Sequence, residues 1–340
     1  MRCLLLFFPL FTALTAVGQD VANGRSPNDQ HTLTLYIEND LFANTDRYYS
    51  NGVRLSYLSP DLEALALPGW AQEVKSWFWL LNQPGYTNNF GLALGQNMYT
   101  PEDTQNPNFT PNDRPYAGWL YGALSLHHKN ADTLHMLELT VGIVGPSALG
   151  EEAQNGVHNF RSLPTTKGWA WQLHDEPGLI LTYEYRLRCE LRDTDSLWGA
   201  DLLPGISLSA GNVLTQAAAG VTLRAGYNVP RDFHGNRIRV AGYALAPDAA
   251  EVRERDRRLS VYLFVSAEQR YVAHNIFLDG NTWQDSPSVD RIPWVTEYEA
   301  GIGLRYGRYR LTYAQVLQTP EFEQQDGRQQ FGTLSASVSF

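Results

Sequence analysis

The chain has 340 residues, of which 43% are hydrophobic, 12% aromatic and 18% charged. This composition is too apolar and too aromatic for an intrinsically disordered protein. The formal net charge of -10 gives no electrostatic basis for binding nucleic acid, because phosphate recognition needs a basic surface. We therefore expect a folded protein with no nucleic-acid partner.

An apolar run at the N-terminus has the pattern of an export signal. It extends from residue 4 to 17, follows Arg2, and ends in small residues up to Gly18. The run is shorter than the ~20 residues that a membrane-spanning helix needs. It predicts a signal peptide over residues 1–18, which leaves 19–340 as one exported domain. The alternative is a buried first helix.

Most of the remaining chain alternates apolar and polar residues with a period of two, which is typical of strands with one face in water. At the C-terminus, Leu334, Ala336 and Val338 share one face and serines occupy the other. We predict an all-β fold, an antiparallel transmembrane β-barrel of about 12 strands with short helices in long extracellular loops. The predicted strands are 31–41, 50–60, 89–98, 117–129, 134–144, 177–189, 204–212, 219–227, 258–268, 296–306, 308–318 and 331–340.

The connections between these strands differ in length, which is typical of outer-membrane barrels with short periplasmic turns and long outer loops. The long connections are 62–88, 145–176, 230–257 and 276–294. A thirteenth extended stretch, 237–245, is assigned to a loop hairpin or a strand extension, because single-chain barrels have an even number of strands. The 18 tyrosines and 9 tryptophans suit interfacial girdles. A soluble β-sandwich or barrel is the alternative.

Polar residues gather where the first predicted strand leaves the membrane. Alternation after Ile37 turns Glu38 and Asp40 inward, with Asn39 at the rim. Two carboxylates and an amide are hard oxygen ligands, which suit Ca²⁺. A hairpin would return Ser50 beside this group. The alternative is a set of ordinary lumen carboxylates paired with arginines.

Two further segments are richer in specific side chains than alternation requires. Before the fourth strand, Arg114 could bind an anionic headgroup and Tyr116 could lie at the membrane interface. The segment 148–160 predicts a short helix in an outer loop. The i, i+4 spacing places Gln154 and His158 on one face of it. A histidine there could take a proton from water at neutral pH; the alternative is a surface histidine without a role.

Taken together, these segments resemble the outer-membrane lipid A 3'-O-deacylase family, over nearly the whole mature chain. The resemblance implies a twelve-stranded barrel in the bacterial outer membrane. It also implies a site between the wall and an outer-loop helix that faces the outer leaflet. The matching stretches are Glu38–Asp40, Ser50–Gly52, Asp113–Gly118, Val144–Gly150, Gln154–His158, Gly168–Gln172, Glu176–Leu179, Asp279–Thr282, Arg305–Arg308 and Thr319–Phe322.

The resemblance also implies roles for individual residues. His158 would be the base that activates water, and Gln154 would orient it or the water. Asn39, Asp40 and Ser50 would bind the metal and the reacting ester, with Ca²⁺ as the cofactor that stabilises the oxyanion.

The substrate and the metal site carry further implications. Glu38 completes the expected metal ligands, and Arg114 with Tyr116 would bind lipopolysaccharide through the lipid A moiety. The family also uses a glutamate shortly after the histidine, whereas 161–167 contains no carboxylate here. Substitutes for it would be Glu151, Glu152, Asp175 or Glu176. We expect a monomer.

Two other functions stay open on the sequence. One is an outer-membrane phospholipase in which Ser50 is the nucleophile and His158 its base. The other is a non-enzymatic porin, which needs only a polar lumen.

Overall fold

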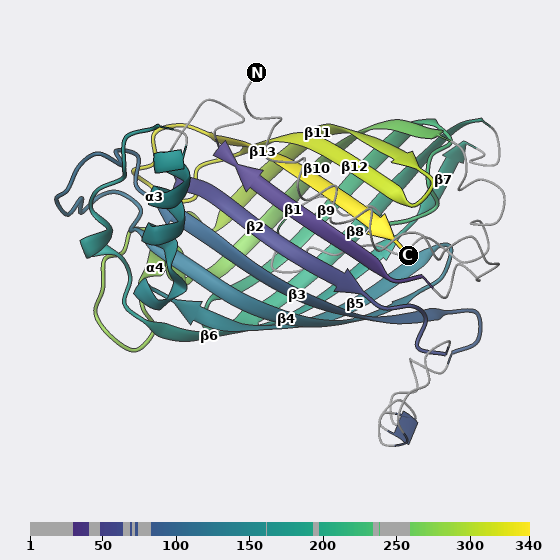
Figure 1. Ribbon diagram of the computed structural model, residues 1–340, viewed down its shortest axis with the longest axis horizontal. Coiled ribbons are helices and arrows are strands. Elements are labelled where there is room, and N and C mark those ends of the chain that lie inside the picture. Colours follow the sequence, from purple (N-terminus) through teal and green to yellow (C-terminus); the bar gives the residue numbers. More distant parts are fainter. Residues whose placement is uncertain are drawn as a thin grey trace.

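The computed structural model describes residues 30–40, 48–63, 69, 72–73, 83–160, 162–192, 197–233, 238 and 259–340. They form one antiparallel sheet that closes into a barrel, because β1 pairs with β13 and β6 with β8 (Figure 1). The expected signal peptide lies outside these residues. The strands are β1 Thr32–Asn39, β2 Tyr48–Leu58, β3 Thr87–Thr100, β4 Ala117–Lys129, β5 Thr133–Val144, β6 Glu176–Leu187, β7 Cys189–Arg192, β8 Trp198–Gly211, β9 Leu214–Tyr227, β10 Leu259–Asn275, β11 Trp294–Tyr306, β12 Tyr309–Gln318 and β13 Gln329–Ser339.

The wall of the barrel has twelve strands, as the sequence predicts. The short β7 follows β6 along the chain, and both pair with β8, so they occupy one position in the wall. Closure gives every wall strand a neighbour on each side, which satisfies the backbone hydrogen bonds where no water is available. Of the extra stretch 237–245, only Ile238 lies within the described residues.

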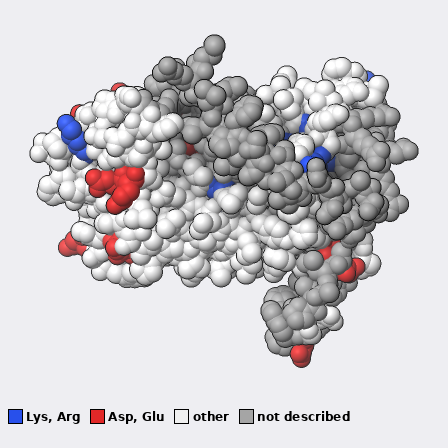
Figure 2. Space-filling model, viewed as in Figure 1, with Lys and Arg blue, Asp and Glu red and all other residues white. Residues whose placement is uncertain are grey.

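The alternation in the sequence is the alternation between the lumen and the lipid-facing surface. In β1, Thr34 and Tyr36 are buried in the lumen, whereas Leu35 lies on the outer face. Around the wall, the outer face exposes a broad apolar belt. Figure 2 shows acidic side chains gathered over the end of the barrel that carries helix α3 (Gly150–Phe160). Exposed members of the belt include Leu55, Leu92, Leu94, Leu124, Leu137, Leu139, Val141, Leu179, Leu181, Leu263 and Val265.

Aromatic pairs lie at both ends of this belt, where girdles are expected at the two membrane interfaces. At the end that holds the first and last strand residues, the rings of Trp198 and Tyr227 are 6.0 Å apart. At the opposite end the rings of Tyr271 and Trp294 are 5.0 Å apart. None of the described helices is long and apolar enough to cross a membrane.

The expected placement of the long loops is wrong for two of the four. Successive connections in an up-and-down barrel lie at alternate ends of the barrel. The connection after β5, which contains α3, and the connection after β10 therefore lie at the same end. The connections after β2 and β9 begin at the other end, where β1 starts and β13 ends (Figure 1). Length alone therefore did not distinguish outer loops from periplasmic ones.

Side chains occupy both ends of the lumen. Near α3, Trp119 and Phe277 belong to an apolar cluster, in which helix α4 (Ile276–Asp279) takes part. At the other end, part of the β9–β10 connection enters the lumen, where Arg224 Nη1 donates to Asp232 Oδ1 at 2.5 Å. Phe233 packs beside it on Leu134 from the wall.

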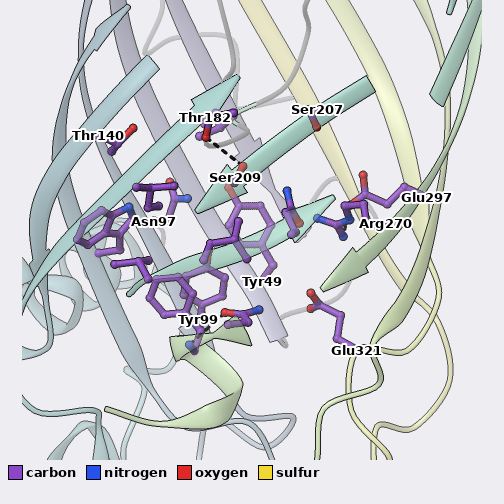
Figure 3. Close-up of a pocket in the computed structure, with 18 of the residues that line it drawn as sticks. Tyr49, Asn97, Tyr99, Thr140, Thr182, Ser207, Ser209, Arg270, Glu297 and Glu321 are labelled. Carbon is purple, nitrogen blue, oxygen red and sulfur yellow. Dashed lines mark hydrogen bonds and ion pairs between the residues drawn. The ribbon is translucent and has the colours of Figure 1, made fainter. Parts of the chain in front are cut away.

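A cavity of about 120 Å³ remains between these two ends. Figure 3 shows its lining, with Tyr49 and Tyr99 on one side and Arg270 beside Glu297 on the other. Arg270 Nη2 and Glu297 Oε1 are 2.7 Å apart, so this charged pair is satisfied within the lumen. The cavity is internal to the barrel and separate from the outer surface where α3 lies.

Candidate active site on the outer wall

The outer-loop helix predicted for 148–160 exists, but it begins later than expected. A 3-10 turn, η5 (Pro146–Ala148), comes first, and Leu149 then adopts a left-handed conformation with φ 58°. The helix α3 starts after this break, at Gly150. Ser147 does not cap it, because the Ser147 amide and hydroxyl donate to Asp175 at 2.8 and 2.6 Å.

Helix α3 lies against the outside of the wall, over β3 and β4 (Figure 1). The Gln96 side-chain amide of β3 donates to the Ala148 carbonyl at 2.6 Å and anchors the start of the helix. Glycines allow the close approach: a Cβ on Gly150 would lie 2.8 Å from the Trp169 ring and 3.2 Å from the Gly118 Cα of β4. The spacing of helix and wall is therefore fixed by hydrogen-bonded and packed groups.

The face of α3 that is buried against the barrel carries the two predicted side chains. Gly150, Gln154 and His158 are buried at i, i+4 and i+8, as the spacing predicts. His158 Nδ1 lies 2.6 Å from the Pro164 carbonyl oxygen. Because a carbonyl can only accept, this contact places the proton on Nδ1 and leaves the lone pair on Nε2. His158 is thus held in the tautomer that a general base requires.

Gln154 is oriented by donors that fix its amide. The Trp169 indole N–H and the Thr166 hydroxyl donate to Gln154 Oε1 at 3.2 and 3.3 Å. Since an indole N–H cannot accept, the other amide atom is the nitrogen. Gln154 Nε2 is buried and has no partner among the described residues. A buried donor of this kind suits a reacting oxygen or a water.

On the wall, the hairpin between β1 and β2 brings polar residues together as expected. Asn39 pairs with Asn51 across the two strands. A β-bulge lies at Ser50, where the register between β2 and β3 shifts. The Ser50 hydroxyl is 2.6 Å from the Thr100 hydroxyl, which belongs to the outer face of β3. The bulge therefore turns Ser50 to the outer face beside Asn51, although strict alternation would turn it inward.

Backbone strain accompanies this bulge. Tyr48, two residues before Ser50, has a positive φ of 69°, which is unusual for an aromatic residue. Its side chain is held in an apolar cluster with Leu278 and Phe322 from the outer connections. A strained backbone conformation of this kind persists only where packing of the surrounding structure holds it in place. Such conformations are frequent near functional sites.

The expected metal ligands lie on different sides of the wall. Glu38 points into the lumen, where the Tyr49 hydroxyl and the Ile238 amide donate to its two oxygens at 2.9 and 2.8 Å. Asn39 has the opposite parity and lies toward the outer face. Asp40, directly after β1, is 1% exposed. A cation held on the outer face by Asn39 would therefore not be reached by Glu38.

The two expected substrate-binding residues are both buried. Arg114 Nη2 donates to Glu321 Oε2 at 2.7 Å, and its guanidinium lies 5.2 Å from the Tyr99 ring centre, on the lumen side. Tyr116 donates to the Lys167 carbonyl at 2.5 Å. Both side chains support the loops around α3. Neither is presented on the outer surface, although the sequence predicts a headgroup contact for Arg114 and an interface position for Tyr116.

The four carboxylates considered as substitutes for the family's glutamate have other surroundings. Glu151 and Glu152 are exposed in the first turn of α3, where their negative charges interact favourably with the positive end of the helix dipole. Asp175 accepts a hydrogen bond from the Ser147 hydroxyl, and Glu176 accepts one from the Thr282 amide at 2.8 Å. The residues that sequence reasoning missed are Thr100, Pro164 and Thr166, which orient the predicted side chains together with Trp169.

The family described as outer membrane protein LpxR matches residues 4–340 of the chain. The chain belongs to the LpxR family. This result confirms the resemblance seen in the sequence, and it identifies the barrel as an outer membrane protein. The helix and wall described above are therefore elements of an LpxR-family barrel.

One solved structure supports the fold, and two others are more distantly similar. LpxR from Salmonella typhimurium is similar with a TM-score of 0.73 and 19% identity, over 90% of this chain and 99% of that chain. The β domain of the Bordetella autotransporter BrkA matches with a TM-score of 0.45 and 10% identity, over 92% of this chain and 100% of that chain. An outer membrane channel from Pseudomonas putida F1 gives 0.38 and 12%, over 95% and 98%. No curated protein matches the sequence.

Proposed function

We propose that the protein is an outer-membrane lipid A deacylase, which hydrolyses the ester of a 3'-acyloxyacyl chain with water activated by His158. The observation that carries the proposal is the buried His158, which is held as a base on an outer-loop helix against the outer wall. This position lies between α3 and the outside of the wall and not in the lumen. It lies at the end opposite the start of β1 and the end of β13, where an outer-leaflet lipid would be reached.

The chemistry follows from the tautomer of His158. His158 Nε2 takes a proton from water, and the water oxygen forms a bond to the ester carbonyl carbon. The ester C–O bond then breaks, and the departing sugar oxygen takes the proton from His158 and becomes a hydroxyl. The Gln154 amide N–H is the group of this helix that can donate to the water or to the developing oxyanion. The products are a free fatty acid and a hydroxyl on the sugar.

Ca²⁺ fits this site in part. Asn39 and Asp40 offer an amide and a carboxylate oxygen at the end of β1, and such hard oxygens are what Ca²⁺ prefers. The described residues contain no group of three or more His, Cys, Asp or Glu that could hold a metal, so water, backbone or substrate oxygens would complete the coordination. When bound, the ion would polarise the ester carbonyl and stabilise its negative charge.

Removal of divalent cations is expected to abolish most of the activity. Losing an oxyanion stabiliser costs ~10²–10³-fold in rate, so we expect EDTA and Asp40→Asn to act to this extent, and Ca²⁺ to restore the chelated wild type. The measurement is fatty acid release from lipid A by purified protein. Asp290→Asn, at an exposed loop position at the same end, is the control. Full activity in EDTA would contradict a metal-dependent mechanism.

A serine nucleophile is less well supported than water. Among the described residues, the Ser50 hydroxyl bonds to Thr100 and not to a histidine, whereas a nucleophilic serine needs its base within hydrogen-bond reach. We expect no labelling of the protein by a fluorophosphonate, and residual activity in Ser50→Ala. Intact-mass analysis after incubation with the reagent checks this. A stoichiometric adduct that disappears in Ser50→Ala would instead establish an acyl-enzyme.

A further inference from the structure

A pair of histidines lies on the outer face of the wall, far from α3, at the end where β1 starts and β13 ends. His128 of β4 and His135 of β5 are directly opposite each other in the register of the two strands. Their ring centres are 5.9 Å apart. Asn88 of β3 is opposite His128 on the other side. One row of outward side chains on β3, β4 and β5 therefore consists of the amide of Asn88 and the imidazoles of His128 and His135.

The hydrogen bonds of the two rings turn one nitrogen of each away from the other ring. His128 Nδ1 is 2.8 Å from Asn88 Oδ1, on the side of β3. His135 Nδ1 is 2.9 Å from the Tyr183 hydroxyl, on the side of β6. Because the two nitrogens of an imidazole point in roughly opposite directions, both Nε2 atoms are directed into the space between β4 and β5.

One of these nitrogens lacks a hydrogen bond. His128 is 2% exposed, and its Nε2 has no partner in the part of the chain that the structure describes. Buried polar atoms in native proteins are normally satisfied. The Tyr86 ring stacks on His128 with centres 4.0 Å apart, so the imidazole cannot simply rotate toward solvent. A ligand between the two rings would satisfy the unpartnered atom.

We propose that His128 and His135 together bind one divalent transition-metal ion, of the Zn²⁺, Ni²⁺ or Cu²⁺ class, through their Nε2 atoms. Neutral imidazole is a preferred ligand of these ions. Ligating histidines characteristically use their other nitrogen to bond an oxygen that orients the ring, and Asn88 and Tyr183 supply those oxygens here. Water would complete the coordination, because the described residues place no third His, Cys, Asp or Glu beside the pair.

The site is independent of the proposed deacylase chemistry, because it lies at the opposite end of the barrel. Titration calorimetry of the purified full-length protein in detergent with ZnCl₂ tests it. We expect one ion per chain, with binding lost in His128→Ala and in His135→Ala. His174→Ala, an exposed position near α3, should bind as the wild type does. Zn²⁺ should raise the thermal unfolding midpoint of the wild type and of His174→Ala. It should not raise the midpoint of His128→Ala or of His135→Ala.

The proposal is overturned if the wild type binds no ion, or if both single variants retain the wild-type affinity. Loss of binding in His174→Ala would also overturn it, by locating the ion elsewhere. Should either alanine variant not fold, electron paramagnetic resonance of the wild type with one equivalent of Cu²⁺ decides. Hyperfine coupling to two nitrogens supports the pair, and a spectrum without nitrogen coupling contradicts it.

Discussion

His158→Ala is expected to lower the rate of ester hydrolysis by ~10²–10⁴-fold, the range typical of a general base. The Nδ1 contact to Pro164 holds the imidazole in one tautomer, and alanine removes the only group on this helix face that can take a proton from water. The rate of fatty acid release from lipid A in detergent measures the effect. Since the rest of the wall is unchanged, the barrel should still fold.

A neighbour on the same helix provides the matched control for this variant. Asn159 is exposed on α3, and Asn159→Ala changes the helix without touching its buried face. We expect near wild-type activity for this variant and equal thermal unfolding midpoints for both. If His158→Ala keeps more than about a tenth of the wild-type rate, an effect well below the usual range, His158 is not the base.

Gly150→Val is expected to reduce activity by on the order of 10²-fold without unfolding the barrel, because a displacement of ~1 Å can cost this much. Even a Cβ at this position would lie 2.8 Å from the rigid Trp169 ring. Valine therefore pushes α3 away from β4, and Gln154 and His158 move with it. The same hydrolysis assay measures the loss, and circular dichroism checks that the sheet persists.

The matched control is another glycine of the same helix. Gly156 is exposed, and a Cβ there would meet nothing within 4 Å. Gly156→Ala should leave activity unchanged and favour the helix by ~1 kcal/mol through propensity. Equal activity of Gly150→Val and the wild type would show that the spacing between helix and wall does not matter for the reaction.

Much of this architecture could be predicted because it rests on periodicity. The alternation of Leu33, Leu35 and Ile37 gave the correct face of β1, since a barrel wall separates lipid from lumen at every second residue. The i, i+4 spacing of Gln154 and His158 likewise gave the correct face of α3. Both inferences use only local geometry.

The features that escaped prediction depend on contacts between distant segments. The bulge at Ser50 adds one residue against β3 and reverses the expected direction of its side chain, with no signal in the local sequence. Arg114 is directed into the lumen by Glu321, which lies 207 residues away. By contrast, counting strands could have assigned each long connection to one rim of the barrel, because the connections of an antiparallel barrel alternate between its two rims.

Mass spectrometry of lipid A from cells that express the wild-type protein or His158→Ala tests the central claim most directly. We predict that the wild type removes the mass of one acyloxyacyl group from lipid A and that cells with the variant at equal abundance retain it. Lipid A that is unchanged by the wild type, both in cells and with purified protein and Ca²⁺, would contradict the proposed deacylase. Deacylation that persists in His158→Ala would contradict the assigned base.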